Sequence, residues 1–202
     1  MDASSALSAF RTTLKQFVEF NEAEWIVFTQ HLKFSLLKKK HYFAEYGKIC
    51  DKAGFIVSGA VRYFHVKEGE EITGYFSFAG EFVSSYKSYL TRQPGITYIQ
   101  ALEDTRLITF TRNDMEQMLA NPILAYKMER FGRQLAEHYL CCYEDRVVSF
   151  LTQSPEERYM QLLNTGSKEV LQRIPQHYIA HYLGITPVSL SRIRRRVMEM
   201  AR

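Results

Sequence analysis

Cysteine is scarce in this sequence, and a long uninterrupted hydrophobic run is missing altogether. The three cysteines are Cys50, Cys141 and Cys142, and the adjacent pair lacks the spacing of metal ligands or of a CxxC redox motif. We therefore expect reduced thiols packed as small apolar groups, with no metal and no cofactor. No apolar run approaches the ~20 residues that a membrane-spanning helix needs, so we expect no membrane partner.

A secretory signal is also lacking. Arg11 and Lys15 interrupt the N-terminal region, which has neither the basic start nor the continuous apolar stretch of such a signal. This pattern predicts a cytoplasmic protein. Hydrophobic residues make up 46% of the chain and charged residues 24%, which is the balance of a soluble globular protein. With 202 residues, the chain is long enough for one large domain and a small one.

Positive charge is unevenly distributed along the chain. The formal net charge is +4, yet residues 1–149 carry 18 basic and 18 acidic side chains. Residues 150–202 carry eight basic side chains against four acidic ones, and the basic ones include the consecutive Arg194, Arg195 and Arg196. A neutral body with a basic end is typical of a protein that binds nucleic acid through one terminal part.

The residue pattern places a β-rich region after two short helices. A helix is expected near residues 5–18, and Asn21 predicts the N-cap of a second helix over 22–32. Over residues 34–110, short aromatic and β-branched runs alternate with glycines, as in an antiparallel β-sandwich or barrel. We therefore expect a first domain that covers residues 1–121.

A helical pattern then leads to the basic end. Pro122 suits the first turn of a helix, and apolar residues follow in steps of four and three, close to one per 3.5 residues. We expect a long helix over residues 122–151 whose apolar seam pairs two copies of the chain. The alternative is that this stripe packs on the β-rich domain of its own chain. The expected dimer interface consists of Leu124, Met128, Phe131, Leu135, Tyr139 and Cys142.

Residues 152–202 have the pattern of a helix-turn-helix. Ser154 predicts an N-cap where this third domain starts. Two further helical stretches, 176–183 and 187–200, meet at Gly184, which permits the positive φ of a tight turn. Apolar side chains of both stretches are spaced to form one small core. They are Ile179, Ala180, Leu183, Ile185, Leu190, Ile193 and Val197.

One face of the last helix is expected to enter the major groove of DNA. At 100° per residue, the outward side chains include Val188, Arg192 and Arg195. Arg192 is the candidate for bidentate recognition of guanine, and Val188 suits a thymine methyl group. The alternative is that the arginines form only a solvated basic face. Phosphate contacts are expected from flanks and helix starts, namely Gln176, His177, Thr186, Ser189, Ser191 and Arg196.

Residues 179–194 resemble the helix-turn-helix of the Crp/Fnr family of bacterial transcription regulators. Upstream, residues 55–62 resemble an early strand of that family's β-roll, residues 80–82 the start of its phosphate-binding cassette, and residues 101–105 the strand after it. The resemblance implies an α+β fold. It would consist of an N-terminal antiparallel β-roll or jelly roll, a long dimerisation helix and a small winged-helix-type helix-turn-helix domain with a short or absent wing.

The same resemblance implies a regulator rather than an enzyme. Its partners would be double-stranded DNA, a second copy of the chain and, as a candidate, RNA polymerase. The homodimer would bind a pseudo-palindromic operator with half-sites ~34 Å apart. Pro187 and Val188 stand where the best-known member carries a base-reading arginine and glutamate, so its operator is not carried over. Only Arg192 matches a base-reading position.

The sequence departs from the family pattern where cyclic nucleotides bind. Members that bind them carry a Gly-Glu pair and later an Arg-Ser pair, whereas this chain has Ser84-Ser85 and Gly95-Ile96. Without the arginine, no charge neutralises a buried cyclic phosphate, so cyclic AMP binding is not expected. The cysteine cluster of oxygen-sensing members is absent too. Candidates for lining a pocket for an unidentified effector, with turn or surface roles as the alternative, are Glu81, Ser84, Ser85 and Tyr86.

Two other classes of function stay open at this point. A barrel of this kind can house a metal enzyme, but the histidines are scattered, and Tyr178 follows His177 where a zinc peptidase motif has its glutamate. The other class is a ligand-binding or interaction module without DNA binding, in which the basic helix would contact a protein. Binding to DNA at low salt separates these classes from a DNA-binding regulator.

Overall fold

The computed structural model describes residues 3–164 and 172–200, apart from the side chain of Met200. These residues fall into two compact units whose boundary lies within one long helix and one β-hairpin. The first unit comprises Met1–Tyr63 and Phe76–Tyr139, and the second comprises Phe64–Tyr75 and Leu140–Arg202. The three-part division expected from the sequence stays a prediction. Within the described ranges, no helix combines the length and apolar character of a membrane span.

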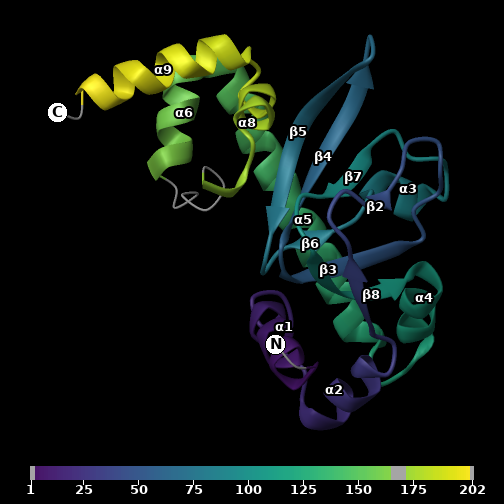
Figure 1. Ribbon diagram of the computed structural model, residues 1–202. Helices are drawn as coiled ribbons and strands as arrows, with labels where there is room; N and C mark the ends of the chain where they lie inside the picture. Colours follow the sequence, from purple (N-terminus) through teal and green to yellow (C-terminus); the bar gives the residue numbers. More distant parts are fainter. Residues whose placement is uncertain (1–2, 165–171, 201–202) are drawn as a thin grey trace. The chain divides into compact units, whose positions relative to one another are not determined.

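Two four-stranded sheets make up the β-rich part of the chain (Figure 1). The strand order is β1-β8-β3-β6 in one sheet and β2-β7-β4-β5 in the other, and the pairs β1–β8, β2–β7, β3–β6 and β3–β8 are antiparallel. The predicted α+β fold with an N-terminal antiparallel β-region is confirmed. The strands are β1 (Lys33–Leu37), β2 (Tyr42–Ala44), β3 (Lys52–Ser58), β4 (Ala60–Lys67), β5 (Glu70–Phe78), β6 (Phe82–Val83), β7 (Tyr98–Ala101) and β8 (Thr105–Thr111).

Strand β3 explains why the sequence of this region contains consecutive apolar residues. Ile56 packs in one core with Val61 of β4 and Ile99 of β7. Its neighbour Phe55 packs in a second core with Ile108 of β8 and with residues of several helices. Successive side chains of a strand point to opposite faces, so a strand buried on both faces needs apolar residues at consecutive positions.

The two N-terminal helices cover one side of the second core. Helix α1 (Ala3–Leu14) buries Ala6, Phe10 and Leu14, one residue per helical turn. The ring centroid of Phe10 lies 4.7 Å from that of Phe55. Helix α2 (Glu22–Thr29) begins with the predicted capping box of Asn21 and Glu24, and it ends earlier than residue 32. Two further short helices of this unit are α3 (Tyr86–Thr91) and α4 (Arg112–Ala120).

The long helix is α5 (Ala125–Thr152), and its predicted dimer seam packs inside its own chain. Leu124, Met128 and Phe131 are 0–1% exposed in the core of the first unit, against which Leu135 and Tyr139 also pack. The Tyr139 hydroxyl lies 3.2 Å from the backbone oxygen of Phe82, to which it donates. A side chain buried within one chain cannot contact a second copy. The expected interface is therefore wrong for Leu124, Met128 and Phe131, which pack inside their own chain as the alternative had it, and it stays a prediction for the half-buried Leu135 and Tyr139.

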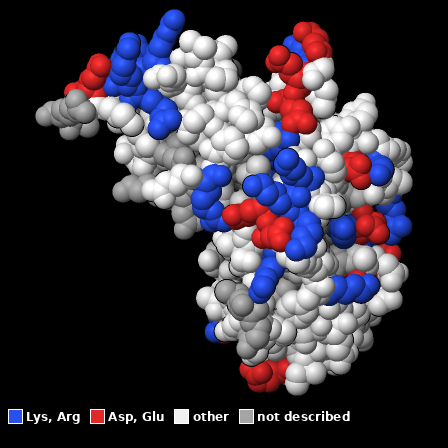
Figure 2. Space-filling model, viewed as in Figure 1, with Lys and Arg blue, Asp and Glu red and all other residues white. Residues whose placement is uncertain are grey.

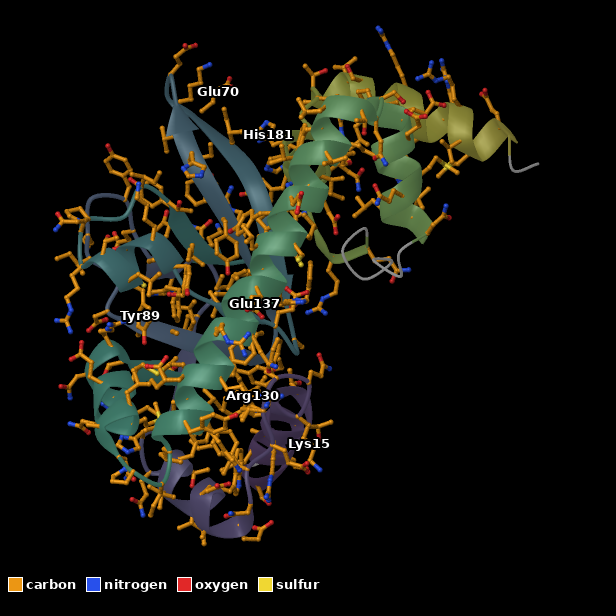
Figure 3. The ribbon with its side chains drawn as sticks, turned by 180° about the vertical axis from the view of Figure 1, so that it is seen from behind. Lys15, Glu70, Tyr89, Arg130, Glu137 and His181 are labelled. Atoms are coloured by element: carbon orange, nitrogen blue, oxygen red, sulfur yellow. The ribbon has the colours of Figure 1, made fainter. Side chains whose placement is uncertain are left out.

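The opposite side of α5 carries polar residues in the first unit. Figure 3 shows Arg130 and Glu137 on the side of the helix that points away from the sheets. Cys142, the last residue of the predicted seam, is half-buried and belongs to the second unit. The 3.5-residue period thus marked the buried stripe correctly, although the partner that covers this stripe is the chain's own β-region.

Helices α6 (Pro155–Asn164), α8 (Gln176–Tyr182) and α9 (Pro187–Met200) follow α5 in the described part of the second unit. The predicted cap of α6 is confirmed, because the Ser154 hydroxyl accepts from Glu157 N at 3.2 Å and the Glu157 carboxylate accepts from Ser154 N at 2.7 Å. Residues 165–171 lie outside the described residues, and so do Lys168, Glu169 and Arg202 of the charge count above.

Candidate nucleic-acid interface

Helices α8 and α9 share the small core that the sequence predicted. Leu190 and Ile193 of α9 are 1% and 5% exposed, and Ile179 and Ala180 of α8 are equally buried. Leu183 completes the buried set, while Ile185 and Val197 are half-buried at its edge. In Figure 1, α6 and α8 lie on the same side of α9. The remaining face of α9 is left to solvent.

The turn between the two helices is a Schellman motif. Gly184 has φ +72° and donates to His181 O at 2.9 Å, and Ile185 donates to Ala180 O at 2.9 Å. Thr186 then caps α9, because its hydroxyl oxygen accepts from Ser189 N at 3.2 Å. Gly184 is in the role predicted from the sequence. The turn therefore fixes where the first turn of α9 points.

The solvent face of α9 carries the residues predicted to enter the major groove. Val188 is 61% exposed, and Arg192, Arg195 and Ser191 are exposed too. Figure 2 shows Lys and Arg side chains gathered over this helix. An open groove runs along each flank of the face. One, of about 590 Å³, is lined by Gln176, Ser191 and Arg194 among others. The other, of about 480 Å³, is lined by Ser189, Arg192 and Arg196 among others.

The four arginines of α9 differ in what they bind. Arg194 Nη1 donates to Gln176 Oε1 at 2.6 Å, and Arg196 Nη2 lies 2.7 Å from Glu156 Oε2. Arg195 Nε is 3.9 Å from Glu199 Oε1. Arg192 makes no hydrogen bond or ion pair with any other described residue. Its guanidinium group is thus the one on this helix that is unengaged within the described part of the chain.

The predicted phosphate contacts lie at the ends of α8 and α9. Gln176 and His177 are exposed at the start of α8, and the His177 ring centroid is 4.1 Å from that of Tyr178. Ser189 is half-buried, with its hydroxyl 2.9 Å from that of Thr186. The Arg196–Glu156 pair is 58% and 33% exposed, and pairs this exposed are weak enough to exchange for phosphate. These contacts to DNA stay predictions.

The candidate effector residues lie in the segment from Glu81 to Tyr86. The Glu81 carboxylate accepts from Phe78 N at 3.2 Å, and burial raises its pKa above the usual value. Ser84 Oγ donates to Lys52 O at 3.1 Å. Ser85 precedes α3 without a capping hydrogen bond from its side chain, and Tyr86 is 50% exposed. Glu81 therefore bonds within its own turn and Ser84 bonds to strand β3, and their role toward an effector stays a prediction.

The sequence reasoning missed two sets of residues. The first is an apolar stripe on α5, where Leu140, Val147 and Leu151 are 69%, 57% and 79% exposed. Their spacing of seven and four was a signal for a second helix face. The second set consists of Arg146 and Phe150, which pack on the turn of the helix-turn-helix. No pattern of the sequence pointed to that contact.

Comparison with known proteins identifies the β-rich region. Residues 35–121 match the family described as cyclic nucleotide-binding domain, and no curated protein matches the chain. The structure resembles the c-di-GMP-responsive global regulator CLP of Xanthomonas campestris, with 14% identity, a TM-score of 0.69, and 90% of this chain and 93% of that chain covered. It also resembles FixK2 of Bradyrhizobium japonicum, with 16% identity, a TM-score of 0.65, and 84% and 86% covered.

A third similar structure comes from Eubacterium rectale and is described as a Crp/Fnr-family transcriptional regulator. It has 18% identity and a TM-score of 0.65, and 90% of this chain and 85% of that chain are covered. The chain thus contains a cyclic nucleotide-binding domain, and its structural neighbours are Crp/Fnr-family transcription regulators. At these identities the likeness establishes the fold. The resemblance noted in the sequence is confirmed to that extent.

The segment expected to hold the cyclic phosphate carries Gly95 and Ile96 in place of an Arg-Ser pair. At the position expected for the phosphate-binding arginine, Gly95 donates to Lys48 O at 2.9 Å, and the next residue, Ile96, is 59% exposed. The nearest arginine in the sequence is Arg92, whose Nη2 lies 2.8 Å from Glu116 Oε1. A cyclic phosphate would therefore meet a backbone turn here and no free guanidinium group.

Proposed function

We propose that this chain, in which a cyclic nucleotide-binding domain is joined to a helix-turn-helix, is a DNA-binding transcription regulator and not an enzyme. The observation that carries the proposal is the solvent face of α9. Val188, Arg192 and Arg195 project there from a helix whose other side is buried against α8. A capped, rigid helix with a basic outer face fits the major groove of B-DNA.

The side chains of this face have different proposed roles. Arg192 reads guanine through two hydrogen bonds, for which its guanidinium group, unengaged by any described residue, is suited. Val188 contacts a thymine methyl group one helical turn earlier, and Arg195 follows Arg192 into the groove. Phosphate contacts come from the flanks, and such contacts orient the helix without reading sequence. They involve Gln176, His177, Thr186, Ser189, Ser191 and Arg196.

We propose that the regulator acts as a homodimer, through a face of α5 different from the one expected. The interface residues proposed are Leu140, Val147 and Leu151, which lie on one stripe and are more than half exposed. A stripe spaced by seven and four residues is the pattern by which two helices pair. Two copies of α9 would then bind the two half-sites of a pseudo-palindromic operator. A cytoplasmic location and contact with RNA polymerase complete the proposal.

A salt titration tests DNA binding. The purified protein is titrated into a random-sequence duplex and into the duplex that it selects from a random library, at several salt concentrations. We expect Kd for both to rise steeply with salt, because arginine contacts to phosphate release counterions. Absence of binding to any duplex at low salt would overturn the proposal and favour an interaction module. A suitable control is Arg133→Ala on α5, because Arg133 is exposed and pairs only with Glu137 among the described residues.

A further inference from the structure

Side chains near the C-terminal end of α5 contact the loop that joins α8 to α9. The Phe150 ring lies within cation–π distance of two guanidinium groups, 4.8 Å from that of Arg146 and 4.7 Å from that of Arg158. A Cβ atom at Gly184 would stand 2.9 Å from Phe150 Cε1. The ring therefore occupies the space that a side chain at position 184 would need. All four residues belong to the second compact unit.

The same two arginines bind the C-terminal end of α8. Arg146 Nη2 donates to Tyr182 O at 2.7 Å, and Arg158 Nη2 donates to Leu183 O at 2.9 Å. Carbonyl groups in the last turn of a helix lack helical partners and carry the negative end of its dipole, so cations stabilise them. Burial lowers the pKa of Arg146, as expected for a guanidinium group removed from water.

Arg158 also contacts the connection between α5 and α6. Only Gln153 and Ser154 separate the two helices, and Arg158 Nη1 donates to Gln153 O at 2.6 Å. Helices α8 and α9 form one body through their shared core. Arg146, Phe150 and Arg158 therefore join that body to the end of α5 at a defined angle.

We infer that Arg146, Phe150 and Arg158 are positioning residues that set the distance between the two recognition helices of the dimer. The inference rests on the proposed function. Because α5 carries the stripe proposed to pair two copies, the angle between α5 and α9 determines which half-site spacing both copies reach at once. We call these three residues the clamp. A rigid clamp makes the dimer selective for one half-site spacing, because the second copy binds tightly only where the geometry permits simultaneous contact.

The test separates positioning from simple stability. The operator selected by the unmodified protein is rebuilt with its half-sites moved apart or together in single-base-pair steps, and a duplex with one half-site is prepared. Arg146→Met and Phe150→Leu each remove part of the clamp. Arg133→Met makes the matching change at an exposed arginine on the same helix. Circular dichroism verifies that each variant is folded.

We expect the unmodified protein and Arg133→Met to lose about tenfold or more in affinity when the spacing changes by two base pairs. Each clamp variant should lose less than about threefold over the same change, with half-site affinity within about twofold of the unmodified protein. Retention of the original spacing dependence by both clamp variants would overturn the inference. So would an equal loss on operator and half-site, which indicates a purely structural role. Absence of binding by the unmodified protein would refute the proposed function itself.

Discussion

At position 184 the backbone takes a conformation that only glycine adopts freely. Gly184 has φ +72°, and its missing side chain leaves room for Phe150. We expect Gly184→Ala to lower the free energy of unfolding by about 1–3 kcal/mol, because alanine is strained at positive φ and the new methyl group displaces the ring. Urea unfolding followed by circular dichroism measures this change.

The matched control is another glycine of the same chain. Gly132 lies inside α5, and a Cβ atom there meets nothing within 4 Å. Gly132→Ala should therefore raise the free energy of unfolding by about 0.5–1 kcal/mol, since alanine loses less backbone entropy in a helix. If both substitutions destabilise the protein to the same extent, the special conformation of Gly184 is not the cause.

Arg192 and Arg196 are only four residues apart, yet they should respond differently to truncation. Arg192→Ala should cost about 1–3 kcal/mol on the selected operator and relax its preference at one base pair, because a bidentate contact to guanine is lost. Arg196→Ala should weaken binding to all sequences about equally, as expected for a phosphate contact. Competition binding against a panel of single-base-pair variants measures both effects. Equal losses for Arg192→Ala on operator and random duplex would refute its role as a base reader.

Among the secondary-structure elements, α5 shows best what periodicity predicts and what it leaves open. Steps of four and three correctly marked Leu124, Met128 and Phe131 as the apolar side of a long helix. The period of a stripe does not specify which surface covers it, and here the sheets and α1 do so. Only long-range packing distinguishes that stripe from the exposed one near Leu151. Local signals such as the caps at Asn21 and Ser154 depend on nearby residues alone, and they were predicted correctly.

The exposed apolar stripe of α5 leads to a prediction about how this helix pairs with a second copy. Val147 is 57% exposed in the single chain. If it lies in the dimer interface, Val147→Glu removes apolar burial of roughly 1.5 kcal/mol or more from each copy and raises the dimer Kd by about 100-fold or more. Analytical ultracentrifugation at micromolar concentration should then show a monomer. Ile26→Glu, at a similarly exposed apolar residue of α2, should leave the mass unchanged. A dimeric mass for Val147→Glu would exclude this interface.

Over the whole molecule, the division of charge was evident from the sequence, and the clamp between α5 and α8 was not. A basic end next to a neutral body follows from counting side chains, and Figure 2 shows the resulting concentration over α9. The contact of Arg146 with Tyr182 joins residues 36 positions apart through a backbone carbonyl group. Any residue can supply such a carbonyl, so the sequence holds no signal for it. The basic outer face of α9 was therefore predictable from the sequence, while the contacts that join α8 to α5 could be found only in the folded chain.

The whole chain also leads to a prediction about ligands, because residues 35–121 match the cyclic nucleotide-binding domain family while the expected phosphate-binding arginine is replaced by glycine. Gly95 stands where the family's arginine would bind the phosphate, and Arg92 is engaged with Glu116. We expect millimolar cyclic AMP to leave the thermal midpoint unchanged. A ligand present at 100 times its Kd stabilises the folded state by about 2.7 kcal/mol, which a thermal scan readily detects. Cyclic GMP and cyclic di-GMP serve as parallel probes in the same assay. A rise of the midpoint with cyclic AMP would contradict the prediction, and loss of that rise in Arg92→Ala would place the phosphate beside Arg92.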